Sequence, residues 1–281
     1  MEINGWRYYN SAAVPTTPPT VDPDTDAISN KSIWSLEGKT PLLARWTTDF
    51  DCGYETNWWY VIKDTVFDVS ALKAKRRYEI NKGDKNFEIR LINPTEYAEA
   101  LLDVQIAAFS AYPKKYRPTV NRESFVNSVG EWEKDYVAFA AFNRENNEIS
   151  GYALLKESHQ NYVEFAVLKT KPQCEKLSVN AALVAGVLKY FEGHLAHGGI
   201  ICDGARSIYH ETAFQDYLEK YFEFRKAYCR LHVSYNPRIK WVISLLFPFR
   251  GLLRRFDSIK IANKINSVLR MEELCREGKA K

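Results

Sequence analysis

The stretch from Tyr136 to Asp203 constrains the fold of this chain most strongly. It holds strand-like apolar runs at Tyr136–Phe142, Ile149–Lys156 and Tyr162–Leu168, an amphipathic helical pattern over Val179–Leu195 and a short buried strand at Gly199–Asp203. Turn residues between the first two runs predict a hairpin, and apolar side chains at helical spacing predict a long crossover helix. Two strands joined by such a helix are typical of α/β proteins. The sequence therefore predicts a mixed sheet flanked by helices.

The same pattern extends on both sides of this stretch. Phe87–Ile92 alternates with period two, and a helix that opens at Pro94 follows it. A helix over His210–Tyr221 and a last strand over Phe224–Tyr235 complete the order β-α-β-β-β-α-β-α-β. We expect the core domain to span residues 87–235.

Residues 1–86 are predicted to be an extension that packs on this core. Four prolines among threonines and aspartates make residues 1–32 look irregular, because proline suits neither a helix interior nor an interior strand. Two strands, Leu42–Trp46 and Asn57–Ile62, are expected next, and a helix completes the extension.

That helix, Asp68–Lys85, is strongly basic. Asp68 or Ser70 can cap its first N–H groups, and Gly83 suits the left-handed position just past its end. A charge-dense helix face is usually only solvated. With Tyr78 among its cations, it also suits a phosphate-bearing donor or acceptor. The cations are Lys73, Lys75, Arg76, Arg77, Lys82 and Lys85.

Residues 236–281 predict a basic, amphipathic helical tail. Between Arg238 and Arg270 the chain carries eight lysines and arginines and a single acidic residue, Asp257. Bulky apolar residues over Trp241–Phe249 lie beside these cations. Two interpretations stay open: a helical hairpin, broken at Pro248, that packs on the core, or binding to an anionic membrane surface.

Composition excludes several classes of protein. The chain has 281 residues, 46% hydrophobic and 26% charged, with a net charge of only +4. Its five cysteines are scattered, so no CxxC metal site exists and reduced thiols are expected. No apolar run approaches the roughly 20 residues that span a bilayer, and no secretion signal is present. We expect a cytoplasmic protein without a metal, which at most touches the inner membrane face.

Particular tracts resemble a known family. Cys202–Thr212, followed by Tyr221–Tyr228, is similar to a GNAT-like, Fem-related group of N-acyltransferases whose members are often found beside bacterial surface-polysaccharide genes. Leu72–Gly83 looks like the basic helix of that group, and Ala44–Asp51 like its entry strand. The resemblance covers roughly residues 1–260.

The resemblance implies a GNAT fold with an N-terminal extension and a basic tail. It also implies N-acyl transfer, from acetyl-CoA or another acyl-CoA, to an amine. The acceptor would be a small molecule or a lipid-linked amino sugar in surface-glycan assembly.

One departure from the family concerns the donor. Acetyl-CoA-dependent GNAT domains follow the fourth strand with a Q/R-x-x-G-x-G/A loop, whose N–H groups face the pyrophosphate. Residues 169–180 contain no glycine here, although lysines can supply charge. Fem-type enzymes, which take aminoacyl-tRNA, also lack the loop, so tRNA is the alternative donor; no DNA partner is expected. The residues expected along an acyl-CoA are Val167, Leu168, Lys169, Lys176 and Asn180.

Acyl transfer to an amine needs a group that accepts the amine proton. Glu164 lies mid-strand between apolar residues and is a candidate base whose pKa burial would raise; alternatively, it lies on a solvent-facing strand surface. Tyr209 can protonate a leaving group, and His210 can titrate near neutral pH. The alternative for these two is a solvated helix start.

Asp203 and Arg206 flank a turn after a buried strand, where α/β sheets bind ligands. Arg206 can bind a carboxylate or phosphate, and Asp203 can hold an amine or sugar hydroxyl; the alternative is a pair that braces the turn. Together with Arg76, they are the predicted substrate-binding residues. Without an unambiguous base, a non-catalytic GNAT-like binding module at a membrane also stays open.

Overall fold

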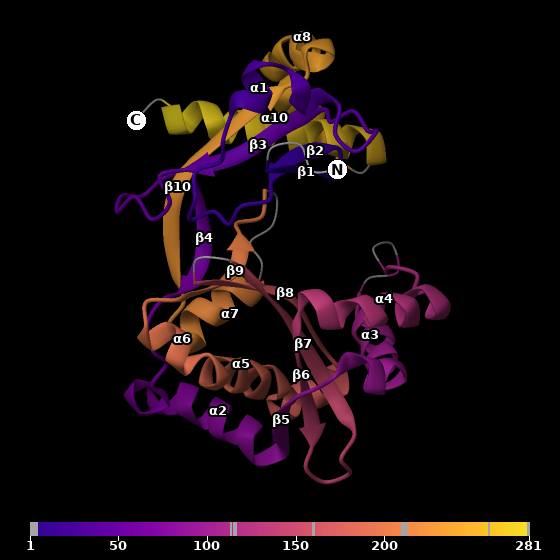
Figure 1. The fold of residues 1–281 in the computed structure, drawn as a ribbon, viewed down its shortest axis with the longest axis vertical. Helices are drawn as coiled ribbons and strands as arrows, with labels where there is room; N and C mark the ends of the chain where they lie inside the picture. The colour runs from indigo at the N-terminus through magenta and orange to yellow at the C-terminus, as the bar shows by residue number, and fades with distance from the viewer. Residues whose placement is uncertain are drawn as a thin grey trace. The chain divides into compact units, whose positions relative to one another are not determined.

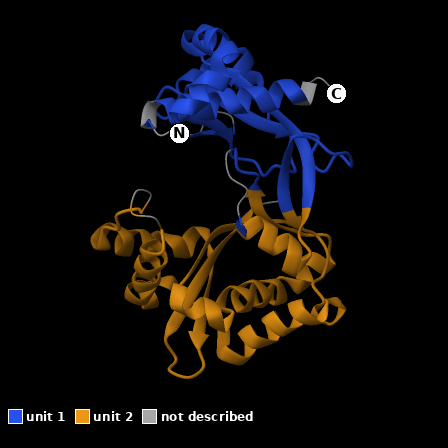
Figure 2. Cartoon of the chain, turned by 180° about the vertical axis from the view of Figure 1, so that it is seen from behind, with its two compact units in different colours: residues 1–61, 205–213, 226–281 blue, residues 62–204, 214–225 orange. Residues whose placement is uncertain are grey.

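The computed structural model describes residues 5–112, 114, 117–158, 161–208, 213–257 and 259–279 (Figure 1). Contacts divide the chain into two compact units (Figure 2). Unit 1 is residues 1–61, 205–213 and 226–281, and unit 2 is residues 62–204 and 214–225. The three regions predicted from the sequence remain a prediction, because the units follow contacts in space rather than continuous stretches of sequence.

Unit 2 contains the strands of the predicted core except the last, Phe224–Tyr235, most of which lies in unit 1. They are β5 (Phe87–Leu91), β6 (Val137–Asn143), β7 (Ile149–Ser158), β8 (Tyr162–Thr170) and β9 (Ile200–Ala205). They lie in the order β9-β8-β7-β6-β5. Neighbours from β5 to β8 are antiparallel, and β8 with β9 is parallel. The predicted mixed α/β class is therefore confirmed.

Helices cover both faces of this sheet, which explains its continuous apolar runs. Ala138, Ala140 and Phe142 of β6 pack in a core with the helices α3 (Ala98–Ser110) and α4 (Arg122–Asp135). The alternate residue Phe139 instead contacts the Tyr190 and Phe191 rings, at 5.1 and 6.3 Å between centroids. The other helices of unit 2 are α2 (Ala74–Asn86), α5 (Val179–Tyr190), α6 (Glu192–Ala196) and α7 (Ala213–Phe222).

Helix α4 has no counterpart among the elements expected from the sequence. Its residues are mostly polar, but Phe125, Val129 and Trp132 recur at helical spacing and pack on the core. The side chain of Asn121 caps it by accepting from the Ser124 N–H at 2.8 Å. A stripe of three apolar residues is too weak a signal beside so many charges. The single helix predicted over Val179–Leu195 is also wrong in part, since it breaks at Phe191 into α5 and α6.

Gly83 has a different role from the one predicted. It lies inside α2, not past its end, and is buried against the first turn of α5. A Cβ on Gly83 would lie 2.7 Å from the Ser178 carbonyl oxygen and 2.9 Å from the Ala182 nitrogen. The glycine therefore lets two helix backbones approach closely. Asp68 does act as a cap, of the short 3-10 turn Val69–Ala71.

Unit 1 has its own set of strands. They are β1 (Trp6–Tyr9), β2 (Ala12–Pro15), β3 (Leu43–Thr48) and most of β4 (Trp58–Lys63) and β10 (Arg225–Tyr235). β2 is parallel to β3, whereas β1 with β2 and β3 with β10 are antiparallel. The irregular start predicted for residues 1–32 is thus wrong for β1 and β2. Positive φ angles at Asn10 and Ser11 turn the chain between these two strands, and the prolines lie at or beyond the end of β2.

The C-terminal segment of unit 1 is helical, as predicted. It consists of α8 (Pro237–Leu246), α9 (Arg250–Leu253) and α10 (Lys260–Lys279), with 3-10 turns at Phe247–Phe249 and Arg254–Phe256. Met271, Leu274 and Cys275 of α10 are buried against strand residues that include Leu43 and Leu231. Within the described residues, no helix is long and apolar enough to cross a membrane.

The close contact at Gly83 predicts an unusual mutational response. Gly83→Ala should lower the free energy of unfolding by about 1–3 kcal/mol, because the added Cβ overlaps backbone atoms of α5 that cannot move aside. Gly130→Ala is the matched control, since Gly130 is helical with no neighbour within 4 Å of its Cβ position. It should stabilise by about 0.5–1 kcal/mol through helix propensity. Urea denaturation of both variants checks the pair; equal stabilisation would contradict the contact.

Candidate functional site

The two parallel strands of unit 2 part from each other after a short pairing. Tyr162, Val163 and Glu164 of β8 pair with Ile200, Ile201 and Cys202 of β9, and the register ends there. β8 nevertheless continues to Thr170, still paired with β7 on its other edge. Beyond Glu164, the edge of β8 that faced β9 therefore has main-chain groups free of strand pairing. Edges of this kind can bind an extended ligand through main-chain hydrogen bonds.

Asp203 is the first residue of β9 past the last pair. Burial raises the pKa of its carboxyl to about 7, and the nearby negative charge of Glu164 raises it further, while a hydrogen bond from the Gln215 side chain lowers it. A carboxyl with a pKa near neutrality can both take and release a proton at pH 7. Gln215, buried on α7, was not singled out from the sequence, because a glutamine inside an amphipathic helix carries no motif.

Glu164 does not have the environment predicted for a buried base. Its side chain is exposed while Val163 and Phe165 on either side are buried, so the solvent-facing alternative is correct. Strand alternation explains this, since neighbouring residues point to opposite faces. Its negative charge acts on the proton affinity of Asp203. A catalytic role of its own stays a prediction.

The thiol of Cys202 lies directly before Asp203. It is fully buried, and burial raises its pKa to about 12. The Gly204 N–H donates to the Cys202 sulfur at 3.1 Å, and Gly204 has a φ of 99°, a conformation that side-chain-bearing residues rarely adopt. A neutral, buried thiol is a poor nucleophile. Cys202 is therefore unsuited to act as a nucleophile.

Arg206 lies in unit 1, where an aromatic ring positions it. Its guanidinium lies over the Trp59 ring, 4.2 Å from the centroid, and Nη1 donates to the Asn57 carbonyl at 2.9 Å. The Lys226 ammonium lies over the same ring at 4.7 Å. Two cations on one indole form a positive patch that suits an anion. Phosphate or carboxylate binding by Arg206 stays a prediction. In the structure, Trp59 and Lys226 belong to the same positive patch as Arg206.

The residues predicted to hold an acyl-CoA have diverse surroundings. Lys169 donates from Nζ to the Tyr112 hydroxyl at 3.3 Å and lies over the Phe109 ring, which places it beside the end of α3. Val167 packs against the α3–α4 core, and Leu168 is half-buried. Asn180 accepts from the Thr170 hydroxyl at 3.0 Å, whereas Lys176 is exposed. Donor binding by these residues stays a prediction.

The N-terminus of α5 is closed by helix α2. Val179 and Ala181 in its first turn are almost completely buried, and the N-cap Ser178 is 3% exposed. The Ser178 hydroxyl donates to a carboxylate oxygen of Glu79 on α2 at 2.8 Å. The helix end that could attract a pyrophosphate is thus covered, and a carboxylate already lies there. These residues do not fit a CoA pyrophosphate at this position.

The other predicted residues carry less information. Arg76 is half-buried on α2. Tyr209 and His210 lie outside the described residues, so their predicted roles stay predictions. Among the residues that the structure describes, no group of three or more His, Cys, Asp or Glu side chains could hold a metal ion.

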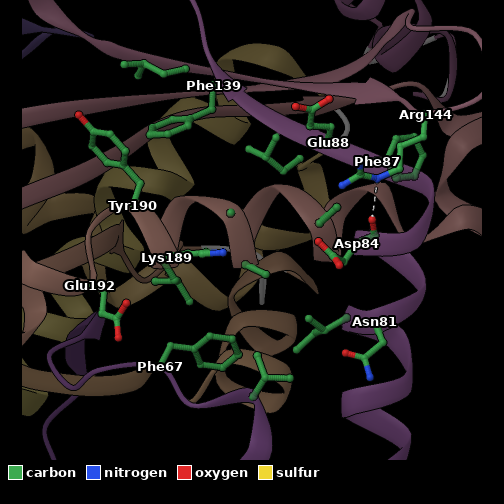
Figure 3. Close-up of a pocket in the computed structure, with 18 residues that line it drawn as sticks. Phe67, Asn81, Asp84, Phe87, Glu88, Phe139, Arg144, Lys189, Tyr190 and Glu192 are labelled. Atoms are coloured by element: carbon green, nitrogen blue, oxygen red, sulfur yellow. Dashed lines mark hydrogen bonds between the residues drawn. The ribbon is translucent and has the colours of Figure 1, made fainter.

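A pocket of about 870 Å³ lies in unit 2 among α2, β5, β6 and α5 (Figure 3). Phe87, Ile89 and Phe139 contribute apolar surface, and Lys189 and Glu192 contribute charges. The Arg144 Nε donates to the Asp84 carbonyl oxygen at 3.0 Å. None of the predicted catalytic or substrate-binding residues described by the structure lines this pocket. We therefore place the candidate chemistry at Asp203.

The raised pKa of Asp203 predicts a pH-dependent stability difference. Its folded value of about 7 exceeds the ordinary 3.8, so its contribution to stability is complete below pH 4 and is lost as the pH rises through 7. Between pH 4 and pH 8, the wild type should therefore lose about 2–4 kcal/mol relative to Asp203→Asn. Urea denaturation at both pH values measures this. Asp216→Asn, at an exposed position on α7, is the control and should show no such change. If the difference in free energy of unfolding between the wild type and Asp203→Asn were the same at both pH values, a raised pKa of Asp203 would be excluded.

The sequence matches no protein-family model and no curated protein sequence. Among solved structures, it is similar to L-PGS from Bacillus licheniformis, with 12% identity, 86% of this chain and 83% of that chain covered, and a TM-score of 0.49. FemX gives 8% identity, coverage of 72% and 74%, and a TM-score of 0.48. The PaiA N-acetyltransferase from Thermoplasma acidophilum, solved in complex with coenzyme A, gives 21% identity, coverage of 38% and 72%, and a TM-score of 0.31. At these values the likenesses say nothing about substrate or donor.

Proposed function

We propose that this chain is an N-acyltransferase in which Asp203 accepts the proton of the amine. The observation that carries the proposal is a carboxyl with a pKa of about 7 at the point where β8 and β9 part. The amine nitrogen attacks the acyl carbonyl, the bond from that carbonyl to the donor oxygen or sulfur breaks, and the amine proton passes to Asp203. A base with a pKa near the working pH is best suited to this transfer.

The parted strands supply a place for the acyl donor. The unpaired edge of β8 after Glu164 includes Val167 and Leu168, two of the predicted donor-binding residues. Main-chain groups there can form hydrogen bonds with amide or carbonyl groups of a donor that lies along this edge, as they would with a further strand. Glu164, exposed beside Asp203, keeps the Asp203 pKa high and can pass the proton on to solvent.

Of the two candidate donors, acyl-CoA and aminoacyl-tRNA, two observations favour aminoacyl-tRNA. Glu79 and the close contact at Gly83 close the α5 N-terminus, where a CoA pyrophosphate would be expected. Lys75 and Lys85 of α2 are exposed, as is Tyr78 at 66%, and Arg76 is half-buried. In the described parts of the chain, no ion pair involves a cation of α2. Uncompensated cations around an exposed ring suit a nucleic-acid backbone and its bases. The acceptor class is an amine, either free or lipid-linked.

Asp203→Asn tests the catalytic proposal. We expect kcat/KM to fall by about 10²-fold or more, because the amine proton loses its acceptor. In the wild type, kcat/KM should rise with pH through about 7. Glu164→Gln should shift this rise to lower pH with a smaller loss, since it removes the charge that raises the Asp203 pKa. Transfer to a panel of amines, followed by mass spectrometry, measures these rates.

Asp216→Asn is the control for this experiment and should retain full activity. Unchanged turnover of Asp203→Asn would exclude Asp203 as the base. An unshifted pH profile for Glu164→Gln would show that the charge of Glu164 does not affect the pKa of Asp203. Glu164 would then have no role at the site.

The donor is tested by ligand-induced stabilisation. A ligand at 100 times its Kd raises the free energy of unfolding by about 2.7 kcal/mol. We expect aminoacyl-tRNA to stabilise the wild type and acetyl-CoA or longer acyl-CoAs to leave it unchanged. Lys75→Glu together with Arg76→Glu should weaken tRNA binding and reduce its salt dependence. Stabilisation by an acyl-CoA but not by tRNA would contradict this expectation and identify acyl-CoA as the donor.

A further inference from the structure

An unbroken stripe of large apolar side chains is exposed along the C-terminal segment of unit 1. Its members follow one another at spacings of three or four residues through α8, α9 and the two 3-10 turns, the spacing that within a helix repeats on one face. About half or more of each side chain is accessible to solvent. We call this set the apolar stripe: Trp241 (65%), Leu245 (60%), Phe249 (57%), Leu252 (54%), Phe256 (48%) and Ile259 (54%).

The opposite face of the same segment packs on unit 1. Ile243 is 7% exposed, and the Phe247 ring lies beneath the guanidinium groups of Arg250 and Arg276, at 4.4 and 3.9 Å from its centroid. A well-packed inner face means that the apolar stripe is held outward. The segment therefore has two apolar faces, of which only one serves the core.

One carboxylate of α10 anchors the segment. Glu273 accepts hydrogen bonds from Arg250 at 3.0 Å, from Arg254 at 2.5 Å and from Arg270. Although burial opposes it, these bonds lower the pKa of Glu273 to about 2. The α9 region is thereby fixed to α10, so the stripe is presented by an ordered element.

The charges beside the stripe are mainly positive. Arg238, Lys240 and Arg255 are exposed, and the one acidic residue between Pro237 and Ile259, Asp257, accepts a hydrogen bond from the Asn266 side chain at 2.6 Å. In the described residues, none of these three cations forms an ion pair. Exposed Trp, Phe and Leu side chains flanked by Lys and Arg match the chemistry of an anionic bilayer interface, with acyl chains beneath phosphate groups.

A second copy of the chain is a poorer match for the same face. A two-fold contact through the stripe would bring the same patch of both copies together. Arg238, Lys240 and Arg255 of one copy would then face the cations of the other, with Asp257 as the one acidic residue in this stretch. Like charges in an interface are unfavourable, whereas an anionic lipid surface neutralises them.

We propose that the apolar stripe inserts into the interface of an anionic membrane, with the flanking cations on lipid phosphates. This inference is independent of the proposed acyl transfer, because it concerns binding by residues of unit 1 alone. The proposed partner is a bilayer surface that carries negatively charged headgroups.

Vesicle flotation tests the proposal with the full chain. Wild-type protein should float with vesicles of phosphatidylcholine and phosphatidylglycerol, and bind phosphatidylcholine alone at least about 10-fold more weakly. Trp241→Ser together with Phe249→Ser should reduce binding to the anionic vesicles by about 10-fold or more, because each change removes apolar surface that the bilayer would bury. Arg238→Glu together with Lys240→Glu should reduce it and remove the dependence on the anionic lipid.

Leu91→Ser is the matched control, because Leu91 is 55% exposed but lies on β5 in unit 2. It should bind vesicles as the wild type does. Circular dichroism melts of the stripe variants should match the wild type, since these side chains are already exposed. Absence of flotation with anionic vesicles, or equal loss in Leu91→Ser, would overturn the proposal. A wild-type dimer that the stripe variants convert to a monomer would assign the stripe to a second copy instead.

Discussion

The parallel pairing of β8 with β9 stops after three residues, and the candidate chemistry depends on that stop. Had the pairing continued, the edge of β8 past Glu164 would be occupied by β9 and closed to a ligand. The stop also leaves Asp203 just beyond the last pair, where burial raises the pKa of its carboxyl to about 7. A carboxyl in this position keeps its proton to a higher pH than an exposed one. In the proposed reaction, one interruption of the ladder thus supplies both the free strand edge for the donor and the proton acceptor.

The contact between α2 and α5 bears on the donor. Helix N-termini attract phosphate because their N–H groups lack partners in the helix and the dipole is positive there. In this chain the backbone around Gly83 covers that end of α5, and Glu79 lies there as the acceptor of the Ser178 hydroxyl. The same helix exposes Lys75 and Lys85. Helix α2 therefore covers the possible anion site at the N-terminus of α5 and carries exposed cations of its own. For this reason, the choice between acyl-CoA and aminoacyl-tRNA as the donor depends on α2 more than on the loop after β8.

The C-terminal segment shows how one stretch can serve two apolar surfaces. The sequence alone offered packing and membrane contact as alternatives, yet the two faces are separated by the helical period. Ile243 and the Phe247 ring are directed to unit 1, and Trp241 and Leu245 are exposed. Glu273 holds this arrangement through its arginines, since a carboxylate bonded by three guanidinium groups is costly to release. Packing and surface exposure are thus complementary in this segment.

The sequence alone determined the strands of unit 2, the presence of a crossover helix and the α/β class, because burial of a sheet on both faces requires continuous apolar runs that are visible in one dimension. It did not show that this helix breaks at Phe191. It also led to Asp203 as a site residue, through its place after a buried strand. Only the tertiary structure decided that Asp203 has a raised pKa and that Glu164 is exposed, since the burial of a carboxyl depends on neighbours such as Gln215 that are distant in sequence. It likewise decided that Gly83 serves a helix contact and not a cap, and that β1 and β2 form in a proline-rich start. Close approach and strand pairing are properties of two segments together, and no local pattern in either one contains them.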